Sequence, residues 1–226
     1  MKLGILLSSG KDSLYAAYLA KKEGHSLACA ITIIPKRTDS YMFHSPNLSL
    51  VPLIAESMGV PLISMETKGE KEKELADLKR AIALAKRMHG IEGIVSGAVR
   101  SIYQKKRVDA ICKELNLESI APLWHVNEEK YLRELLKNKF EVIIVAIAAQ
   151  GLDEKWLGRE INADAVAELK QLHEKHGISI VGEGGEFETL VLNCPLFKKR
   201  IEIIRSEKKI ENENTGVLII EDAHLA

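Results

Sequence analysis

Two rhythms of apolar and polar positions alternate along the first half of the chain. Short apolar runs, which are typical of strands buried on both faces of a sheet, occupy residues 3–7, 27–34, 61–65, 93–96 and 119–121. Between these runs, apolar residues recur at every third or fourth position, which predicts helices over residues 13–23, 45–59, 71–89 and 108–115. Ser45 and Pro46 are expected to cap and begin the second of these helices. The alternation predicts an α/β fold with a five-stranded parallel sheet flanked by helices.

The rhythm changes after Pro122. A helix near residues 128–138, an apolar strand at 142–148 and a helix at 162–175 are followed by a strand-rich segment. Its predicted strands cover residues 178–181, 187–192, 201–204 and 217–220. The polar segment 206–215 is expected to be an exposed connection of a hairpin. We therefore expect a smaller α+β domain over residues 126–226, after a first domain over residues 1–125.

Charge and cysteine content narrow the class of protein. The 226 residues contain 32 Lys and Arg and 32 Asp and Glu, so the basic excess typical of nucleic-acid binders is absent and no nucleic acid is expected as a partner. No apolar stretch is long enough for a membrane span, and the first residues do not resemble a signal peptide. The three cysteines are far apart and form no metal-binding pattern. A cytoplasmic location, where thiols stay reduced, is the simplest interpretation.

The chemistry is concentrated in Ser8-Ser9-Gly10-Lys11-Asp12-Ser13, which lies between the first predicted strand and the first helix. Small residues let backbone N–H groups approach an anion at a helix N-terminus. Lys11 adds a positive charge, and Asp12 suits a Mg²⁺ ion bound to phosphate. Both side chains are expected to be exposed. The alternative is a polar loop that only caps a helix, but the whole string in this setting favours phosphate binding over capping.

This string resembles the SGGKDS loop of the N-type ATP pyrophosphatases, or PP-loop proteins, which include asparagine, GMP and NAD synthetases and tRNA thiolases. Ser9 departs from the glycine of that motif. The resemblance implies a Rossmann-like PP-loop fold for the first domain. Further strings resemble the diphthine–ammonia ligase family over nearly the whole chain. They are Gly97-Ala98-Val99, Ser101, Tyr103-Gln104, Arg107-Val108, Ala121-Pro122-Leu123-Trp124 and Glu183-Gly184-Gly185-Glu186-Phe187-Glu188-Thr189.

Membership of that family implies a reaction. ATP would adenylate the carboxylate of diphthine, a modified histidine on a translation elongation factor. Pyrophosphate would leave, and ammonia would displace AMP to give the amide diphthamide. The chain leaves no room for a glutaminase domain, so free ammonia is the expected nitrogen source.

The resemblance, together with the chemistry and position of the residues, suggests roles for individual residues. Catalytic roles are expected for Lys11, Asp12, Glu183 and Glu186, with Mg²⁺ at Asp12. ATP is expected to contact Ser8, Ser9, Gly10, Lys11, Asp12, Ser13, His44 and Gly97. The acceptor is expected to contact Tyr103, Gln104, Trp124, Glu183, Gly184, Gly185, Glu186, Phe187, Glu188 and Thr189.

The acidic string has a plain alternative, a hairpin turn at Gly184-Gly185 with glutamates in solvent. Three carboxylates within six residues repel one another, however, and a cationic partner relieves that repulsion. Diphthine carries a trimethylammonium group, which carboxylates and aromatic faces attract. This charge argument favours an acceptor site.

Other candidates stay open. His44 is either a capping histidine or a nucleotide contact near the end of the second strand. Gly97 follows the fourth strand, where a missing side chain would leave room for ATP. The basic residues between Arg100 and Arg107 are either a solvated face or a contact for phosphate or an acidic protein.

Two rival functions remain. A tRNA-thiolating PP-loop enzyme needs a reactive cysteine, and none of Cys29, Cys112 and Cys194 lies in an activating setting. A non-catalytic ATP sensor would bind ATP without releasing pyrophosphate. A homo-oligomer is possible with any of these functions.

Overall fold

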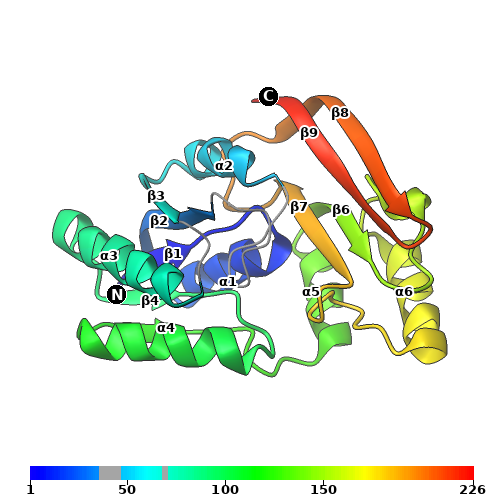
Figure 1. The fold of residues 1–226 in the computed structure, drawn as a ribbon. Coiled ribbons are helices and arrows are strands. Elements are labelled where there is room, and N and C mark those ends of the chain that lie inside the picture. Colours follow the sequence, from blue (N-terminus) through cyan, green and yellow to red (C-terminus); the bar gives the residue numbers. More distant parts are fainter. Residues whose placement is uncertain (36–46, 68–70) are drawn as a thin grey trace.

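A five-stranded parallel sheet forms the first layer of the molecule, as predicted (Figure 1). The computed structural model describes residues 1–35, 47–67 and 71–226. The strands are β1 (Lys2–Leu6), β2 (Ser26–Pro35), β3 (Leu62–Thr67), β4 (Gly93–Val95) and β5 (Glu118–Ile120), in the order β3-β2-β1-β4-β5. The strand order reverses between β1 and β4. At such a reversal the loops after the two strands diverge and leave a crevice for a ligand.

Helices cover this sheet. They are α1 (Lys11–Lys22), α2 (Val51–Met58), α3 (Lys71–His89) and α4 (Ile102–Glu114). The predicted start of the second helix is wrong: after the short 3₁₀ turn η1 (Leu48–Leu50), α2 begins at Val51 with Pro52 in its first turn. Ser45 and Pro46 lie outside the described residues. The helix ends at Gly59, whose φ of 69° is the left-handed conformation that glycine adopts without strain.

A four-stranded antiparallel sheet forms the second part of the molecule. Its strands β6 (Glu141–Ala148), β7 (Phe187–Asn193), β8 (Ile201–Asn212) and β9 (Thr215–Leu225) follow the order β7-β6-β9-β8. Two helices, α5 (Glu128–Lys137) and α6 (Ala163–His176), and the 3₁₀ turn η2 (Glu154–Trp156) complete this part. Figure 1 shows β7 between the parallel sheet and the long β8–β9 hairpin.

Two predictions for this half are wrong. Residues 178–181 form no strand, because side chains rather than a neighbouring strand bind their backbone: Glu186 accepts from the Ser179 N–H, and Val181 O accepts from Lys11. Residues 206–215 are mostly strand, since β8 continues to Asn212 and only two residues turn before β9. Most side chains in the outer part of β8 are exposed, so no alternation of apolar and polar residues marks it.

Helix α1 joins the two sheets. The ring of Tyr15 on α1 stacks on Tyr131 of α5 and meets Phe140, just before β6, edge-on, with both centroid distances 5.2 Å. One apolar core runs through these residues into both sheets. Residue 125 lies between β5 and α5, and the division of the chain into domains 1–125 and 126–226 stays a prediction.

We find no helix in the described ranges with the length and apolar character that a membrane span requires.

Candidate active site

The loop between β1 and α1 is held by its own serine hydroxyls. The Ser13 hydroxyl lies 3.1 Å from that of Ser8 and accepts from the Ser8 N–H at 3.2 Å. The Ser8 hydroxyl also accepts from the Gly10 N–H at 3.2 Å. Ser9 is buried, and its carbonyl accepts from the Val191 N–H on β7 at 3.0 Å. The loop is therefore shaped before any ligand binds, which is how an anion-binding loop lowers the cost of binding.

Gly97 approaches this loop for a reason that the sequence did not suggest. A Cβ atom there would lie 2.6 Å from the carbonyl carbon of Asp12 and 2.6 Å from the Ser13 nitrogen. Gly97 thus lets the loop after β4 pack against the first turn of α1. Its missing side chain makes room for the chain itself, and Gly97 also lines the pocket described below.

Lys11 is buried, with 2 % of its surface exposed, so its expected exposure is wrong. Its ammonium group lies 3.0 Å from both carboxylate oxygens of Asp12 and donates to Val181 O at 2.6 Å. The ring centroids of Tyr131 and Phe187 lie 5.8 and 5.7 Å from this ammonium group. These contacts replace the water that a buried ammonium loses.

Asp12 is tied to the second half of the chain by a residue that sequence reasoning missed. The hydroxyl of Tyr131 donates to Asp12 Oδ1 at 2.7 Å. Burial, and then the Asp12 charge, raise the pKa of Tyr131 well above its usual value, so the phenol keeps the proton that it donates. The two residues are 119 positions apart, and nothing local in the sequence around Tyr131 indicates this contact.

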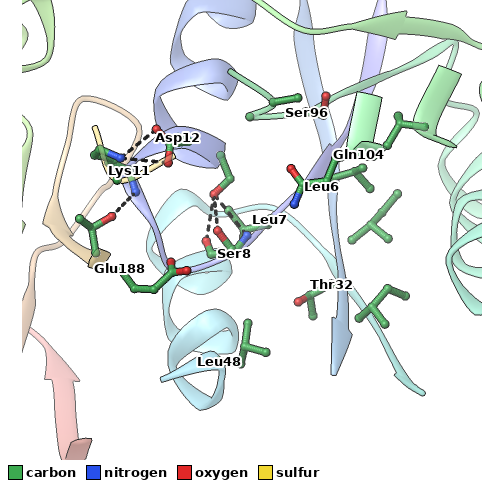
Figure 2. A pocket seen from close by; sticks show the side chains of 18 of the residues that line it. Leu6, Leu7, Ser8, Lys11, Asp12, Thr32, Leu48, Ser96, Gln104 and Glu188 are labelled. Atoms are coloured by element: carbon green, nitrogen blue, oxygen red, sulfur yellow. Dashed lines mark hydrogen bonds and ion pairs between the residues drawn. The ribbon is translucent and has the colours of Figure 1, made fainter. Parts of the chain in front are cut away.

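A pocket opens beside this loop, at the carboxyl ends of the parallel strands (Figure 2). Figure 2 shows Lys11, Asp12 and Glu188 at one end and Thr32 and Gln104 at the other. The lining also includes the apolar side chains of Leu6, Ile31, Ile33, Leu78 and Val108, and residues of the second half of the chain, Val181, Gly182, Phe187, Glu188 and Thr189. Val181, Phe187 and Thr189 lie at the end that holds Lys11, because each of them contacts that residue. Both halves of the chain therefore build one pocket, whereas the sequence suggested a nucleotide site in the first half alone.

The three glutamates of the acidic string have different surroundings. Glu183 accepts from the backbone N–H groups of Arg100 and Ser101, both at 2.9 Å. Glu186 folds back on its own loop, accepting from the N–H groups of Ser179 and Gly184 at 2.8 Å each. Only Glu188 lines the pocket. The string is thus neither a hairpin turn between two strands nor a single cluster of free carboxylates.

Burial dominates the electrostatics of these acids. It raises the pKa of Glu188 to about 7, with the charges of Asp12 and Glu183 adding to the rise and Lys11 opposing it. Burial also raises the pKa of Glu183, while its two backbone hydrogen bonds act in the opposite direction. Glu188 can therefore hold or release a proton near neutral pH.

Thr189 both contacts the loop and lines the pocket. It is 4 % exposed, and its hydroxyl accepts from the Lys11 N–H at 3.1 Å. Gln104, Phe187, Glu188 and Thr189 line the pocket, whereas the other predicted acceptor contacts lie outside its lining: Tyr103, Trp124, Glu183, Gly184, Gly185 and Glu186. The guanidinium carbon of Arg107 lies 3.3 Å from the centroid of the Tyr103 ring, and Lys105 Nζ lies 5.6 Å from the centroid of the Trp124 ring.

The other candidate residues are His44, the basic run and the cysteines. His44 lies outside the described residues. In the basic run, Arg100 pairs with Glu128 at 3.2 Å and Lys105 pairs with Asp109 at 2.7 Å, so these two charges are neutralised within the chain. All three cysteines are buried free thiols. Burial raises the pKa of Cys29 and Cys112 to about 11 and that of Cys194 to about 12, which disfavours a reactive thiolate.

A divalent cation would find few ligands from the protein alone. No group of three His, Cys, Asp or Glu side chains suited to a metal occurs in residues 1–35, 47–67 and 71–226. Mg²⁺ in phosphate-transfer enzymes is commonly bound by one or two carboxylates together with the phosphates of the substrate. Asp12, with a third of its side chain exposed, and Glu188 are carboxylates suited to bind Mg²⁺ together with the phosphates of ATP.

Comparisons with known proteins cover almost the whole chain. Family models described as the diphthamide synthase N-terminal and C-terminal domains match residues 1–119 and 127–225. The diphthine–ammonia ligases of Rattus norvegicus and Homo sapiens are each 36 % identical over 231 residues, which cover 94 % of this chain and 86 % of theirs. The diphthine–ammonia ligase of Schizosaccharomyces pombe is 34 % identical over 232 residues, covering 96 % of this chain and 38 % of its own.

One solved structure, described as a predicted subunit of tRNA methyltransferase from Methanocaldococcus jannaschii, is 18 % identical with a TM-score of 0.44. It covers 86 % of this chain and 98 % of its own. A similarity this low carries no argument about function.

Proposed function

The chain belongs to the diphthine–ammonia ligase family, and we propose on that basis that it is an ATP-dependent ligase that converts diphthine and ammonia to diphthamide. One observation carries the proposal: the family models match both the loop Ser8–Ser13 and the string Glu183–Thr189. In the fold these two segments, far apart in sequence, meet at one pocket.

The reaction follows from the chemistry of the acceptor. A carboxylate is a poor electrophile, because its leaving group would be an oxide. An oxygen of the diphthine carboxylate attacks the α-phosphorus of ATP, and the bond to pyrophosphate breaks. Ammonia then attacks the acyl carbon, AMP leaves with the carboxylate oxygen, and the nitrogen loses a proton. Binding in a fixed orientation supplies much of the acceleration in such bimolecular steps.

We place the phosphates of ATP at the loop Ser8–Ser13 and the base toward the other end of the pocket, where Leu6, Thr32 and Gln104 lie (Figure 2). The N-terminus of α1 and the Lys11 ammonium provide positive charge for the phosphates. The side chains of Leu6, Ile31 and Ile33 offer an apolar surface to a flat base. The serine network leaves the loop little freedom to rearrange, so its shape need not change much when the phosphates bind.

We propose Asp12 as the main protein contact for Mg²⁺, with Glu188 nearby. When bound, the ion supplies charge neutralisation for the phosphates. Tyr131 and Lys11 hold the Asp12 carboxylate in place. Because the phenol keeps its proton, Tyr131 fixes one oxygen of Asp12 without adding a charge.

We propose that the acceptor enters at the end of the pocket formed by Phe187 and Glu188. The trimethylammonium of diphthine suits an aromatic ring beside carboxylates. Glu188, with its pKa near 7, is suited to take the proton that the attacking nitrogen loses. The acceptor would be a translation elongation factor, and the free thiols support a reducing, cytoplasmic setting.

Incubation of the protein with ATP, Mg²⁺, ammonium and diphthine-bearing elongation factor tests this function. We expect AMP and pyrophosphate in equal amounts, and a mass change on the factor that corresponds to replacement of a carboxylate oxygen by an amide nitrogen. Formation of ADP in proportion to turnover would contradict adenylation.

The rival functions are less well supported. A thiolase that transfers sulfur through a cysteine needs a thiolate, and burial raises the pKa of all three thiols here. A sensor would bind ATP in the same pocket but release no pyrophosphate, so the same assay separates it from a ligase.

A further inference from the structure

The edge of β7 that faces away from β6 lies against the loop Ser8–Ser13, where we place the phosphates of ATP. Strand β7 is an edge strand of the four-stranded sheet, in which its hydrogen-bonded neighbour is β6. On its other side, the Val191 N–H donates to Ser9 O at 3.0 Å, and the Thr189 hydroxyl accepts from the Lys11 N–H at 3.1 Å. The two contacts, two residues apart on β7, hold both sides of Gly10.

The Thr189 contact supplies what the start of α1 lacks. The first N–H groups of a helix have no partner within it, and a side chain at the N-cap position usually accepts from one of them. Here the N-cap is Gly10, which has no side chain. The Thr189 hydroxyl takes over that function for Lys11, the first residue of the helix, from 178 positions away.

The surroundings make this hydrogen bond hard to replace. Thr189 is 4 % exposed and Lys11 is 2 % exposed, so water has little access to the Lys11 N–H. Without the hydroxyl, that N–H would stay buried without an acceptor, a state that proteins avoid. The loop would have to shift, and the Lys11 ammonium would shift with it.

We propose that Thr189 is a positioning residue for ATP rather than a contact for the acceptor. Its hydroxyl holds the backbone of Lys11, and through it the loop Ser8–Ser13, in the shape that receives the phosphates. This inference rests on the proposed function, since it assumes that ATP binds at this loop. It makes the C-terminal sheet a structural part of the nucleotide site.

Three variants of the full chain separate the hydroxyl from the packing of its neighbours. Thr189→Val keeps the size and the preference for a strand but removes the acceptor. Thr189→Ser keeps the hydroxyl. Thr189→Ala differs from the serine variant only because it lacks that hydroxyl. Binding of a non-hydrolysable ATP analogue is measured by calorimetry without acceptor, and the KM of the diphthine-bearing acceptor is measured at saturating ATP. Melting temperatures show which variants are folded.

We expect the Kd for the ATP analogue to rise about tenfold in Thr189→Val, with Thr189→Ser close to the parent. The acceptor KM should stay within about twofold of the parent value, because the hydroxyl faces the loop. If the valine variant does not fold, the serine and alanine variants should show the same difference in Kd.

Parental ATP affinity in a folded Thr189→Val, or equal losses in Thr189→Ser and Thr189→Ala, would overturn the inference alone. A selective rise in the acceptor KM would overturn it as well and return Thr189 to the acceptor site. If the parent protein binds no ATP, the proposed function fails together with the inference.

Discussion

The buried ammonium group of Lys11 donates a 2.6 Å hydrogen bond to the backbone carbonyl of Val181. The two residues come from opposite halves of the chain, 170 positions apart. The same ammonium neutralises Asp12, so the side chain expected to neutralise phosphate also fixes the loop that precedes β7. Lys11 is therefore expected to contribute both to ATP turnover and to stability.

Lys11→Met should abolish pyrophosphate release and also destabilise the protein. Methionine keeps an unbranched stem but has no ammonium group, so Val181 O and the Asp12 carboxylate lose the donor that Lys11 provides. We expect the free energy of unfolding to fall by about 1–3 kcal/mol, less than for a fully buried ion pair, because Asp12 keeps 33 % of its side chain exposed. Urea denaturation and a pyrophosphate assay measure the two effects.

Lys170→Met is the matched control. Lys170 pairs with Glu129 at the surface, where 41 % and 51 % of the two side chains are exposed. Exposed pairs of this kind contribute about 0–1 kcal/mol, so stability and turnover should both stay close to those of the parent. A Lys11→Met variant as stable as this control would contradict the structural role of the Lys11 ammonium.

Tyr131→Phe should weaken ATP binding without removing any charge. The substitution deletes the hydroxyl that donates to Asp12 Oδ1 and leaves the stacked rings intact. We expect a loss of about 1 kcal/mol in stability and a rise of roughly three- to tenfold in the KM for ATP, because Asp12 loses a fixed orientation.

Tyr18→Phe provides a matched comparison, because the rings of Tyr18 and Tyr131 both stack with that of Tyr15. The Tyr18 hydroxyl donates to Asn138 Oδ1 at 2.6 Å, and neither residue lines the pocket. This variant should lose similar stability and keep the parental KM for ATP. Equal kinetic effects in the two variants would show that Tyr131 acts only through packing.

The sequence predicts the parallel half of the fold well because each element there carries its own signal. Helix α3 covers the predicted residues 71–89, and the buried strands appear as short apolar runs. Residues 178–181 look like such a run, yet they form an irregular loop whose backbone is bound by Lys11 and Glu186. A pattern of apolar residues reports burial, and burial alone does not distinguish a strand from a loop held by side chains.

The candidate site also has one part that the sequence predicts and another part that it does not. The loop Ser8–Ser13 and its setting could be predicted, because a strand, small residues and a helix follow one another locally. Its partners could not be predicted, because Tyr131, Thr189 and Val181 reach Asp12 and Lys11 through the packing of the second half of the chain on α1. Residue types alone do not reveal contacts across more than a hundred positions.

Glu188 should make stability fall as the pH rises toward neutrality. Its pKa of about 7 in the fold lies above the ordinary value of 4.5, so between these values the folded protein binds a proton that the unfolded chain has released. Stability therefore falls with rising pH across that window, by about 3 kcal/mol at most. Urea denaturation at pH 5 and pH 8 measures the change.

Glu188→Gln removes this titration. We expect the variant to gain stability over the parent at pH 8 and to differ little from it at pH 5. Glu211→Gln, at an exposed position on β8, should follow the parent at both values. If the pH dependence of Glu188→Gln equals that of the parent, Glu188 is ionised in the fold well below neutral pH and is unsuited to accept a proton.

Glu186→Gln tests how the acidic string supports the nucleotide site. Both Glu186 oxygens accept from backbone N–H groups, those of Ser179 and Gly184. Glutamine offers one oxygen and places an NH₂ group against the other N–H, so one acceptor is lost and two donors face each other. The loop between these residues contains Val181, whose carbonyl holds Lys11. We therefore expect Glu186→Gln to raise the KM for ATP as well as that for the acceptor, each by roughly five- to tenfold.

Glu188→Gln, assayed beside Glu186→Gln, separates an effect on nucleotide binding from an effect on the acceptor. It leaves the backbone contacts of the loop intact and removes a charge that lines the pocket, so it should affect the acceptor KM and the amidation rate more than nucleotide binding. Calorimetry with an ATP analogue and acceptor titrations at saturating ATP give the two readouts for each variant. If Glu186→Gln raises only the acceptor KM and leaves ATP binding at the parental value, the loop does not transmit its shape to Lys11. The Glu186 carboxylate would then act on the acceptor directly, and its two backbone contacts would be incidental to ATP binding.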